Sequence, residues 1–112
     1  MITNFDYYYP APKNLPAGWI PIIEKLTKDL HELETVININ QVKEKFGGLR
    51  YYVSYPEDEK YDKEEVDIAE ELIRKAEEET LHTCQVCGSG DASAVGGGWI
   101  TTLCKRCATV RR

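Results

Sequence analysis

The sequence predicts an α+β protein in which two helices pack on an antiparallel β-hairpin, followed by a C-terminal zinc ribbon or treble-clef-like knuckle. Three observations support this prediction. Two stretches repeat apolar residues at helical spacing, two shorter stretches between them alternate apolar and polar residues, and two Cys-x-x-Cys pairs lie near the end of the chain. The chain has 112 residues, which suits one compact domain or a small body with a metal-stabilised appendage.

Residues 1–17 are predicted to form an extended arm ahead of the body. Its prolines oppose a regular helix, because proline lacks a backbone N–H and restricts φ. Its aromatic side chains must either pack across the body or be presented to a partner, and we expect packing because an exposed apolar arm is a liability. These residues are Phe5, Tyr7, Tyr8, Tyr9, Pro10, Pro12 and Pro16.

Residues 18–82 are predicted to form the α+β body, which begins with a helix from about Ile20 to Glu34. Pro21 suits the first turn of this helix, where its missing N–H would have no partner. His31 is interpreted as a surface or boundary residue, since no second metal ligand lies one turn away. The apolar stripe of the helix consists of Trp19, Ile22, Ile23, Leu26, Leu30 and Leu33.

Two strands are expected next, and they form an antiparallel hairpin. Residues 35–42 alternate β-branched residues with asparagines, which is typical of a half-buried strand. Residues 49–55 also alternate, and Arg50 and Tyr52 share one face of the strand. Gly47-Gly48 is predicted to supply the positive φ angles of the tight turn.

A second helix is predicted from about Asp62 to Leu81, and it is strongly acidic. Residues 57–83 contain twelve acidic and four basic side chains, in a chain whose net charge is −5. This balance excludes the broad positive field of a DNA-coating protein. Glu70–Arg74 and Glu71–Lys75 have the i,i+4 spacing of ion pairs. The buried stripe is predicted to contain Val66, Ala69, Leu72, Ile73 and Ala76.

Residues 83–112 are predicted to form a zinc-binding module. Cys84 and Cys87 form one pair, Cys104 and Cys107 form the other, and sixteen residues separate the pairs. This spacing is typical of a four-cysteine site, in which two tight turns direct four thiolates at one Zn²⁺. Because every position is filled by a thiolate, we expect one zinc ion with a structural role. The alternative, a redox Cys-x-x-Cys, would need a thioredoxin-like βαβ context that the sequence does not indicate.

The sequence does not predict an enzyme. The expected zinc site uses every cysteine, and the chain has neither a His-Glu-x-x-His helix nor a Gly-x-Ser-x-Gly turn. A hydrolase would require a second metal or a carboxylate cluster that these motifs do not reveal.

Two basic segments and one acidic segment are candidates for partner binding. Basic and aromatic residues together can follow phosphates and stack on bases, although they also occur on ordinary solvated surfaces. The acidic helix repeats Glu64, Glu71 and Glu78 every seven residues, which could imitate a row of phosphates or be a solvated face. The candidate basic and aromatic residues are Lys43, Lys45, Phe46, Arg50, Tyr52, Lys105 and Arg106.

The hairpin motif reads QVKEKFGGLRYY over residues 41–52. It resembles a family of small, mostly uncharacterised proteins encoded by bacteriophages and prophages. The resemblance extends over residues 18–107, through a Gly-Trp-Ile-Pro helix start at 18–21, Cys-x-x-Cys-Gly at 84–88, Gly-Gly-Trp at 97–99 and the final knuckle at 104–107. It implies a mobile-element context and no established biochemical activity.

We therefore expect a non-enzymatic, zinc-stabilised protein that binds a host protein, such as a defence factor, and modulates it by inhibition. The alternative is a nucleic-acid-binding zinc-ribbon regulator. The chain has no apolar run of about 18 residues and no signal-peptide pattern at its start, so we expect it in the cytoplasm of the bacterial host, without membrane contact. An aromatic arm and a hairpin edge also favour a homodimer, whereas an arm folded across its own sheet favours a monomer.

Overall fold

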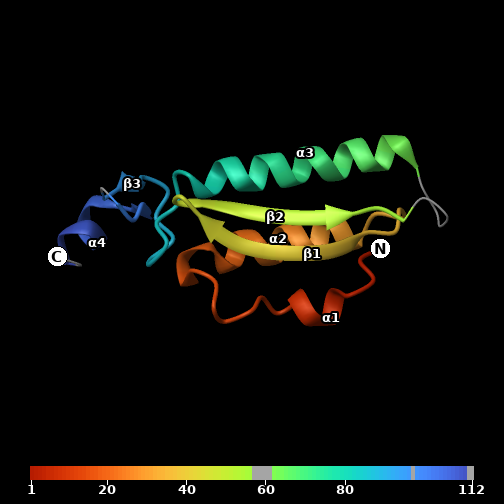
Figure 1. Ribbon diagram of the computed structural model, residues 1–112, viewed down its shortest axis with the longest axis horizontal. Coiled ribbons are helices and arrows are strands. Elements are labelled where there is room, and N and C mark those ends of the chain that lie inside the picture. Colours follow the sequence, from red (N-terminus) through yellow and green to blue (C-terminus); the bar gives the residue numbers. More distant parts are fainter. Residues whose placement is uncertain (57–61, 97, 111–112) are drawn as a thin grey trace.

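The computed structural model describes residues 1–56, 62–96 and 98–110. The molecule is elongated, with extents of 50 × 23 × 22 Å, and its C-terminal module forms one end of the long axis (Figure 1). The elements in chain order are α1 (Phe5–Tyr8), η1 (Ala17–Trp19), α2 (Ile20–His31), β1 (Asn38–Lys45), β2 (Gly48–Ser54), α3 (Lys63–Thr80), β3 (Ser93–Val95), β4 (Thr101–Leu103) and α4 (Lys105–Val110).

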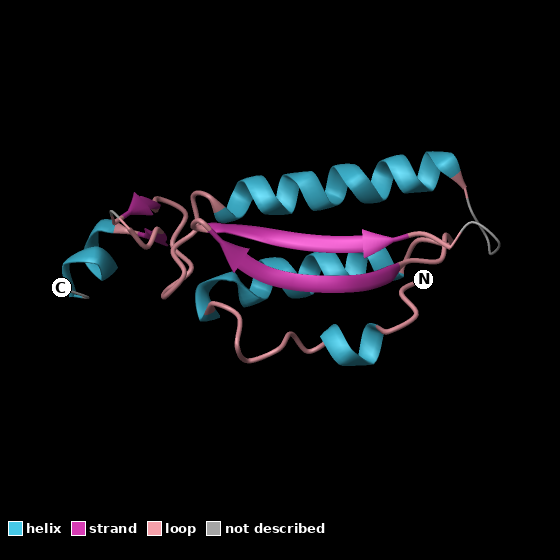
Figure 2. Cartoon of the chain, in the orientation of Figure 1, coloured by secondary structure: helices cyan, strands magenta, loops and turns pink. Residues whose placement is uncertain are grey.

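The predicted α+β body is confirmed. β1 and β2 pair as an antiparallel hairpin, and α2 and α3 pack together beside it (Figure 2). Their apolar sides meet in one core, which completely buries Trp19 and Leu30, together with Ile37, directly before β1, and Leu49 of β2. Helical and strand periodicities therefore place one apolar face of each element on the same interior.

The helix boundaries follow local hydrogen bonding. α3 starts directly after Asp62, whose carboxylate accepts a hydrogen bond of 2.9 Å from the Glu64 N–H and caps the helix. α2 stops at His31, three residues before the predicted Glu34. Among the described residues, none of the helices combines the length and apolarity that a membrane crossing requires.

The ion pairing on α3 differs from the prediction. Arg74 pairs with Glu71 at 2.6 Å and with Glu78 at 2.8 Å, instead of with Glu70. The Glu70 carboxylate accepts a hydrogen bond of 3.1 Å from the Tyr55 hydroxyl. One arginine thus links two acidic residues on the exposed side of the helix.

The strand that was expected at residues 35–42 begins later and extends to Lys45. A bulge interrupts its register between Ile39 and Gln41, where Asn40 is the additional residue. This bulge allows both Ile39, which pairs with Val53, and Val42, three residues on, to join the core face. Strict alternation would have put them on opposite faces.

The turn of the hairpin also differs from the prediction. Its two central residues are Phe46, with φ 55°, and Gly47, with φ 78°, whereas Gly48 already pairs with Lys45. A two-residue turn with positive φ at both positions matches the right-handed twist of the strands. Phe46 therefore adopts a conformation that favours glycine, and its side chain is 68% exposed at the tip.

The arm is not extended throughout, because Phe5–Tyr8 forms the short helix α1. All three prolines follow this segment, so they do not prevent the Tyr9 N–H from bonding to the Phe5 carbonyl at 2.9 Å. The expectation that the arm packs across the body is supported: Ile2 is buried beside Ile37, and the Phe5 ring stacks on His31. This packing removes one of the two reasons for a homodimer, which stays a prediction.

Candidate metal centre

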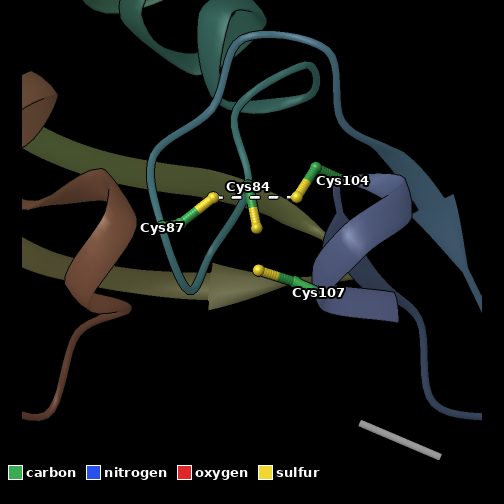
Figure 3. A group of neighbouring side chains, drawn as sticks. All are labelled: Cys84, Cys87, Cys104 and Cys107. Atoms are coloured by element: carbon green, nitrogen blue, oxygen red, sulfur yellow. Dashed lines mark hydrogen bonds between the residues drawn. The ribbon is translucent and has the colours of Figure 1, made fainter. Parts of the chain in front are cut away.

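The four cysteines come from three separate segments and meet at one point. Cys84 and Cys87 lie in the loop after α3, Cys104 follows β4, and Cys107 lies in α4. Their sulfur atoms all lie within 4.8 Å of one another and face a common centre (Figure 3). Cys84, Cys104 and Cys107 are buried, whereas Cys87 is exposed at the edge of the cluster.

The distances fit a metal site better than a disulfide. All four cysteines are free thiols, and the sulfurs of Cys87 and Cys104 are 3.6 Å apart. A disulfide would require about 2.05 Å. Four thiolates at about 2.3 Å from a tetrahedral ion lie roughly 3.8 Å from one another. The cluster can therefore hold one metal ion after small side-chain movements.

The first cysteine pair is shaped by a tight backbone turn. The Gly88 N–H donates to the Cys84 carbonyl at 2.9 Å, and the Cys84 N–H donates to the Ser89 carbonyl at 2.8 Å. Gly88 has φ 81°, which favours glycine. This turn folds the chain back beyond Cys87, so both sulfurs of the pair reach the same side.

The electrostatics of the cluster differ between its thiols. Burial opposes ionisation of Cys84, but the backbone N–H groups of Cys87, Cys104 and Val86 outweigh it and lower the pKa of Cys84 to about 6. The side chain of Cys104 and burial raise the pKa of Cys107 to about 12. Without a cation, four adjacent thiols cannot all ionise, because each thiolate opposes the next.

The module has little else to hold it together. Within the described residues, its buried cluster contains only Ala92 and Leu103 besides the three buried cysteines, with Ala108 packed partly against it. The strand pair β3–β4 has three residues in each strand. So small an apolar core does not stabilise a fold alone, and small domains of this kind depend on a metal or disulfides.

The cysteine-containing module, residues 83–110, contacts the body through a few specific hydrogen bonds. The Gly18 N–H donates to the Gln85 carbonyl at 2.8 Å, and the indole N–H of Trp19 donates to the Thr83 carbonyl at 2.8 Å. The hydroxyl of Thr102 donates to the carbonyl of Gly47 in the hairpin turn. The segment η1 thus contacts the cysteine loop, and the tip of the hairpin contacts β4.

The candidate binding residues form two groups. Lys43, Arg50 and Tyr52 lie together on the hairpin, since Lys43 is directly opposite Arg50 and its Nζ is 5.9 Å from the Tyr52 ring centre. Lys105 and Arg106 are exposed on α4, where they line a hollow beside Cys87 and Cys104. The hairpin group and the α4 group are therefore described as two separate candidate surfaces.

The sequence interpretation missed Trp99 as a surface residue. Trp99 lies two residues before the start of β4 at Thr101, and its side chain is 79% exposed. Trp99 and Phe46 line a pocket of about 190 Å³, together with Lys45 and Ile100. The sequence contains a partial indication of this exposure. Trp99 directly follows Gly96-Gly97-Gly98, and three glycines have no side chains for the indole ring to pack against.

The chain matches no family model, no curated protein and no solved structure in the three comparisons made.

Proposed function

We propose that the four cysteines bind one zinc ion with a structural role, in a treble-clef-like module. Four sulfur ligands and the absence of a free coordination position favour Zn²⁺ without catalysis. The order of a cysteine loop, a short strand pair and a helix that carries the last ligand supports this type of module. Elemental analysis of the purified protein is expected to find one zinc per chain, and less than half an equivalent of any metal would contradict the proposal.

The function that the geometry supports best is binding to another protein, without enzymatic activity. The observation that carries this proposal is the pair of exposed aromatic side chains, Phe46 and Trp99, that line one pocket. Large aromatic residues around a pocket are typical binding hot spots, because they bury much area at a small entropic cost. We refer to Phe46, Trp99 and Ile100 as the aromatic end.

The aromatic end is held in a defined arrangement before any partner arrives. The backbone N–H of Gly47 donates to the Glu44 carboxylate at 2.8 Å, and the Gly47 carbonyl accepts from Thr102 of the metal module. The pocket therefore forms where the hairpin turn meets the module. A preformed site avoids part of the ordering cost of association.

The resemblance to phage and prophage proteins suggests the kind of partner. We propose a host protein in the bacterial cytoplasm, whose activity the bound chain inhibits by covering a surface. Inhibition by contact requires no catalytic group, which agrees with a metal site whose ligands are all protein thiolates.

Replacing both aromatic residues at this end is expected to abolish partner capture. In a pull-down from bacterial lysate with metal-loaded protein, F46A/W99A should lose at least 90% of the protein that the wild type retains, because hot-spot truncations each cost about 2 kcal/mol or more. Y7A is the matched control, since Tyr7 is 83% exposed but lies on α1 in the arm. Equal losses for F46A/W99A and Y7A would contradict this site, as would full retention by F46A/W99A.

A further inference from the structure

The outer face of the β1–β2 hairpin is unusual in its charge. The alternate residues on the other face enter the core, and those of the outer face are exposed or half-buried. This outer face is made of Gln41, Lys43, Lys45, Arg50, Tyr52 and Ser54. It contains three cations and no carboxylate, although the chain as a whole has a net charge of −5.

Two cations of this face oppose each other across the hairpin. Lys43 lies directly opposite Arg50, and like charges in directly opposed positions destabilise a strand pair. In the described part of the chain, the ion pairs all lie on α2 and α3 and none involves Lys43, Lys45 or Arg50. A glutamate at residue 43 would pair favourably with Arg50 and stabilise the hairpin. The stability of the hairpin therefore does not explain why two cations oppose each other here.

Each lysine of the face also lies beside an aromatic ring. The Nζ atom of Lys43 is 5.9 Å from the Tyr52 ring centre, and that of Lys45 is 5.5 Å from the Phe46 ring centre. Lys43 and Lys45 are two residues apart on one strand, which separates them by roughly 6.8 Å. The rings flank this pair of lysines, since Tyr52 lies opposite Gln41 and Phe46 lies in the turn. Cations together with aromatic rings on one face are the combination with which proteins hold the phosphates and stack the bases of a single strand.

We propose that this hairpin face binds single-stranded nucleic acid. Lys43, Lys45 and Arg50 contact successive phosphates, and the Tyr52 ring stacks on an unpaired base. A duplex fits less well, because its bases are already stacked on one another and do not offer a face to Tyr52. This function goes beyond the proposed protein binding. The two surfaces adjoin where Lys45 lines the pocket beside Phe46. Lys43, Arg50 and Tyr52 lie outside that pocket, so either proposal can fail without the other.

Fluorescence anisotropy with labelled 12-nucleotide thymidine and uridine oligomers tests the proposal on the full, metal-loaded chain. We expect saturable binding whose logarithmic salt dependence has a slope of about −2, from three phosphate contacts at about 0.7 each. K43E should weaken binding at least tenfold and reduce the slope by about 0.7. It should unfold at the same or a higher temperature than the wild type, because it places opposite charges at the pair with Arg50.

Two further variants separate stacking from charge. Y52A should weaken binding about fivefold or more, whereas Y52F, which keeps the ring, should bind like the wild type. K28E is the control for net charge, because it makes the same charge change at an exposed position of α2. F46A/W99A should still bind the oligomers, with Kd within about tenfold of the wild type.

Several outcomes would overturn the proposal. One is the absence of saturable binding to both oligomers at 100 mM salt. Another is an equal loss of oligomer affinity in K43E and K28E. A third is equal binding of a glutamate 12-mer peptide together with no effect of Y52A, which would show that the face attracts any polyanion. Binding of only one oligomer would support the proposal and identify DNA or RNA as the ligand.

Discussion

Removal of the metal is expected to unfold residues 84–110 and to weaken the body that supports them. The module buries few apolar side chains besides its cysteines. If it binds zinc as proposed, metal binding provides most of its stability. Structural zinc contributes apparent free energies of about 10–16 kcal/mol at neutral pH in small zinc-dependent folds. This amount exceeds what three-residue strands and a single buried leucine can supply.

Removal of the metal by a chelator is also expected to change the packing of the body where it contacts the module. The indole N–H of Trp19 is bonded to Thr83, next to Cys84, and Trp19 is fully buried. After chelation we expect a red shift of tryptophan emission and faster hydrogen exchange at the Gly18 N–H, which bonds to Gln85. Spectra that are unchanged in protein shown to be metal-free would contradict a structural role for the ion.

Serine variants of the cysteines are expected to destabilise the module without the use of a chelator. C84S and C104S each remove one thiolate, leave a three-sulfur site, and should lower the midpoint of thermal unfolding by 10 °C or more, as expected for a loss of several kcal/mol in a domain of this size. V86S is the matched control, because Val86 lies between the first two cysteines and is 50% exposed. V86S should retain one metal ion and change the midpoint by no more than a few degrees.

Gly18→Ala is expected to separate the metal module from the body. A Cβ atom at this position would lie far inside contact distance of the Cys84 carbonyl oxygen, 2.7 Å from the Gly88 nitrogen and 2.9 Å from the Gln85 carbonyl carbon. All three are backbone atoms of the cysteine loop, which cannot move aside as a flexible side chain would. The two segments must therefore part, at a cost of about 3 kcal/mol or more in the free energy of unfolding.

Chemical denaturation of metal-loaded protein measures this loss. Gly90→Ala is the control, since Gly90 lies in the same module and a Cβ there would meet no atom within 4 Å. We expect G90A to stay within about 0.5 kcal/mol of the wild type. G18A and G90A of equal stability would show that the close approach of η1 and the cysteine loop does not hold the two parts together.

The helices and most of the core could be predicted because their residues interact with near neighbours in the chain. The three- and four-residue spacing of Ile23, Leu26 and Leu30 indicates a buried face for any helix that forms there, and the structure buries all three. The cysteine spacing is equally local within each pair. It predicted a common site, and the four sulfurs do converge.

The sequence patterns gave wrong predictions for the hairpin, where the conformation of one strand depends on its pairing with the other. Nothing in residues 38–45 indicates that Asn40 forms a bulge, which depends on the register of β2. The pair Gly47-Gly48 looked like the turn, but Lys45 pairs with Gly48 and forces the positive φ onto Phe46 instead. Register is a property of two strands together, so one strand does not reveal it.

Periodicity and cysteine spacing act over a few residues, so the sequence alone was enough to predict the α+β class, the apolar faces of both long helices, the hairpin and the four cysteines of the candidate metal site. How these parts meet could be seen only in the folded structure. It places Gly18 against the cysteine loop, Thr102 against the hairpin turn, and Trp99 beside Phe46. These contacts join residues more than 50 positions apart, and such long-range packing is decided by the shapes of the folded parts.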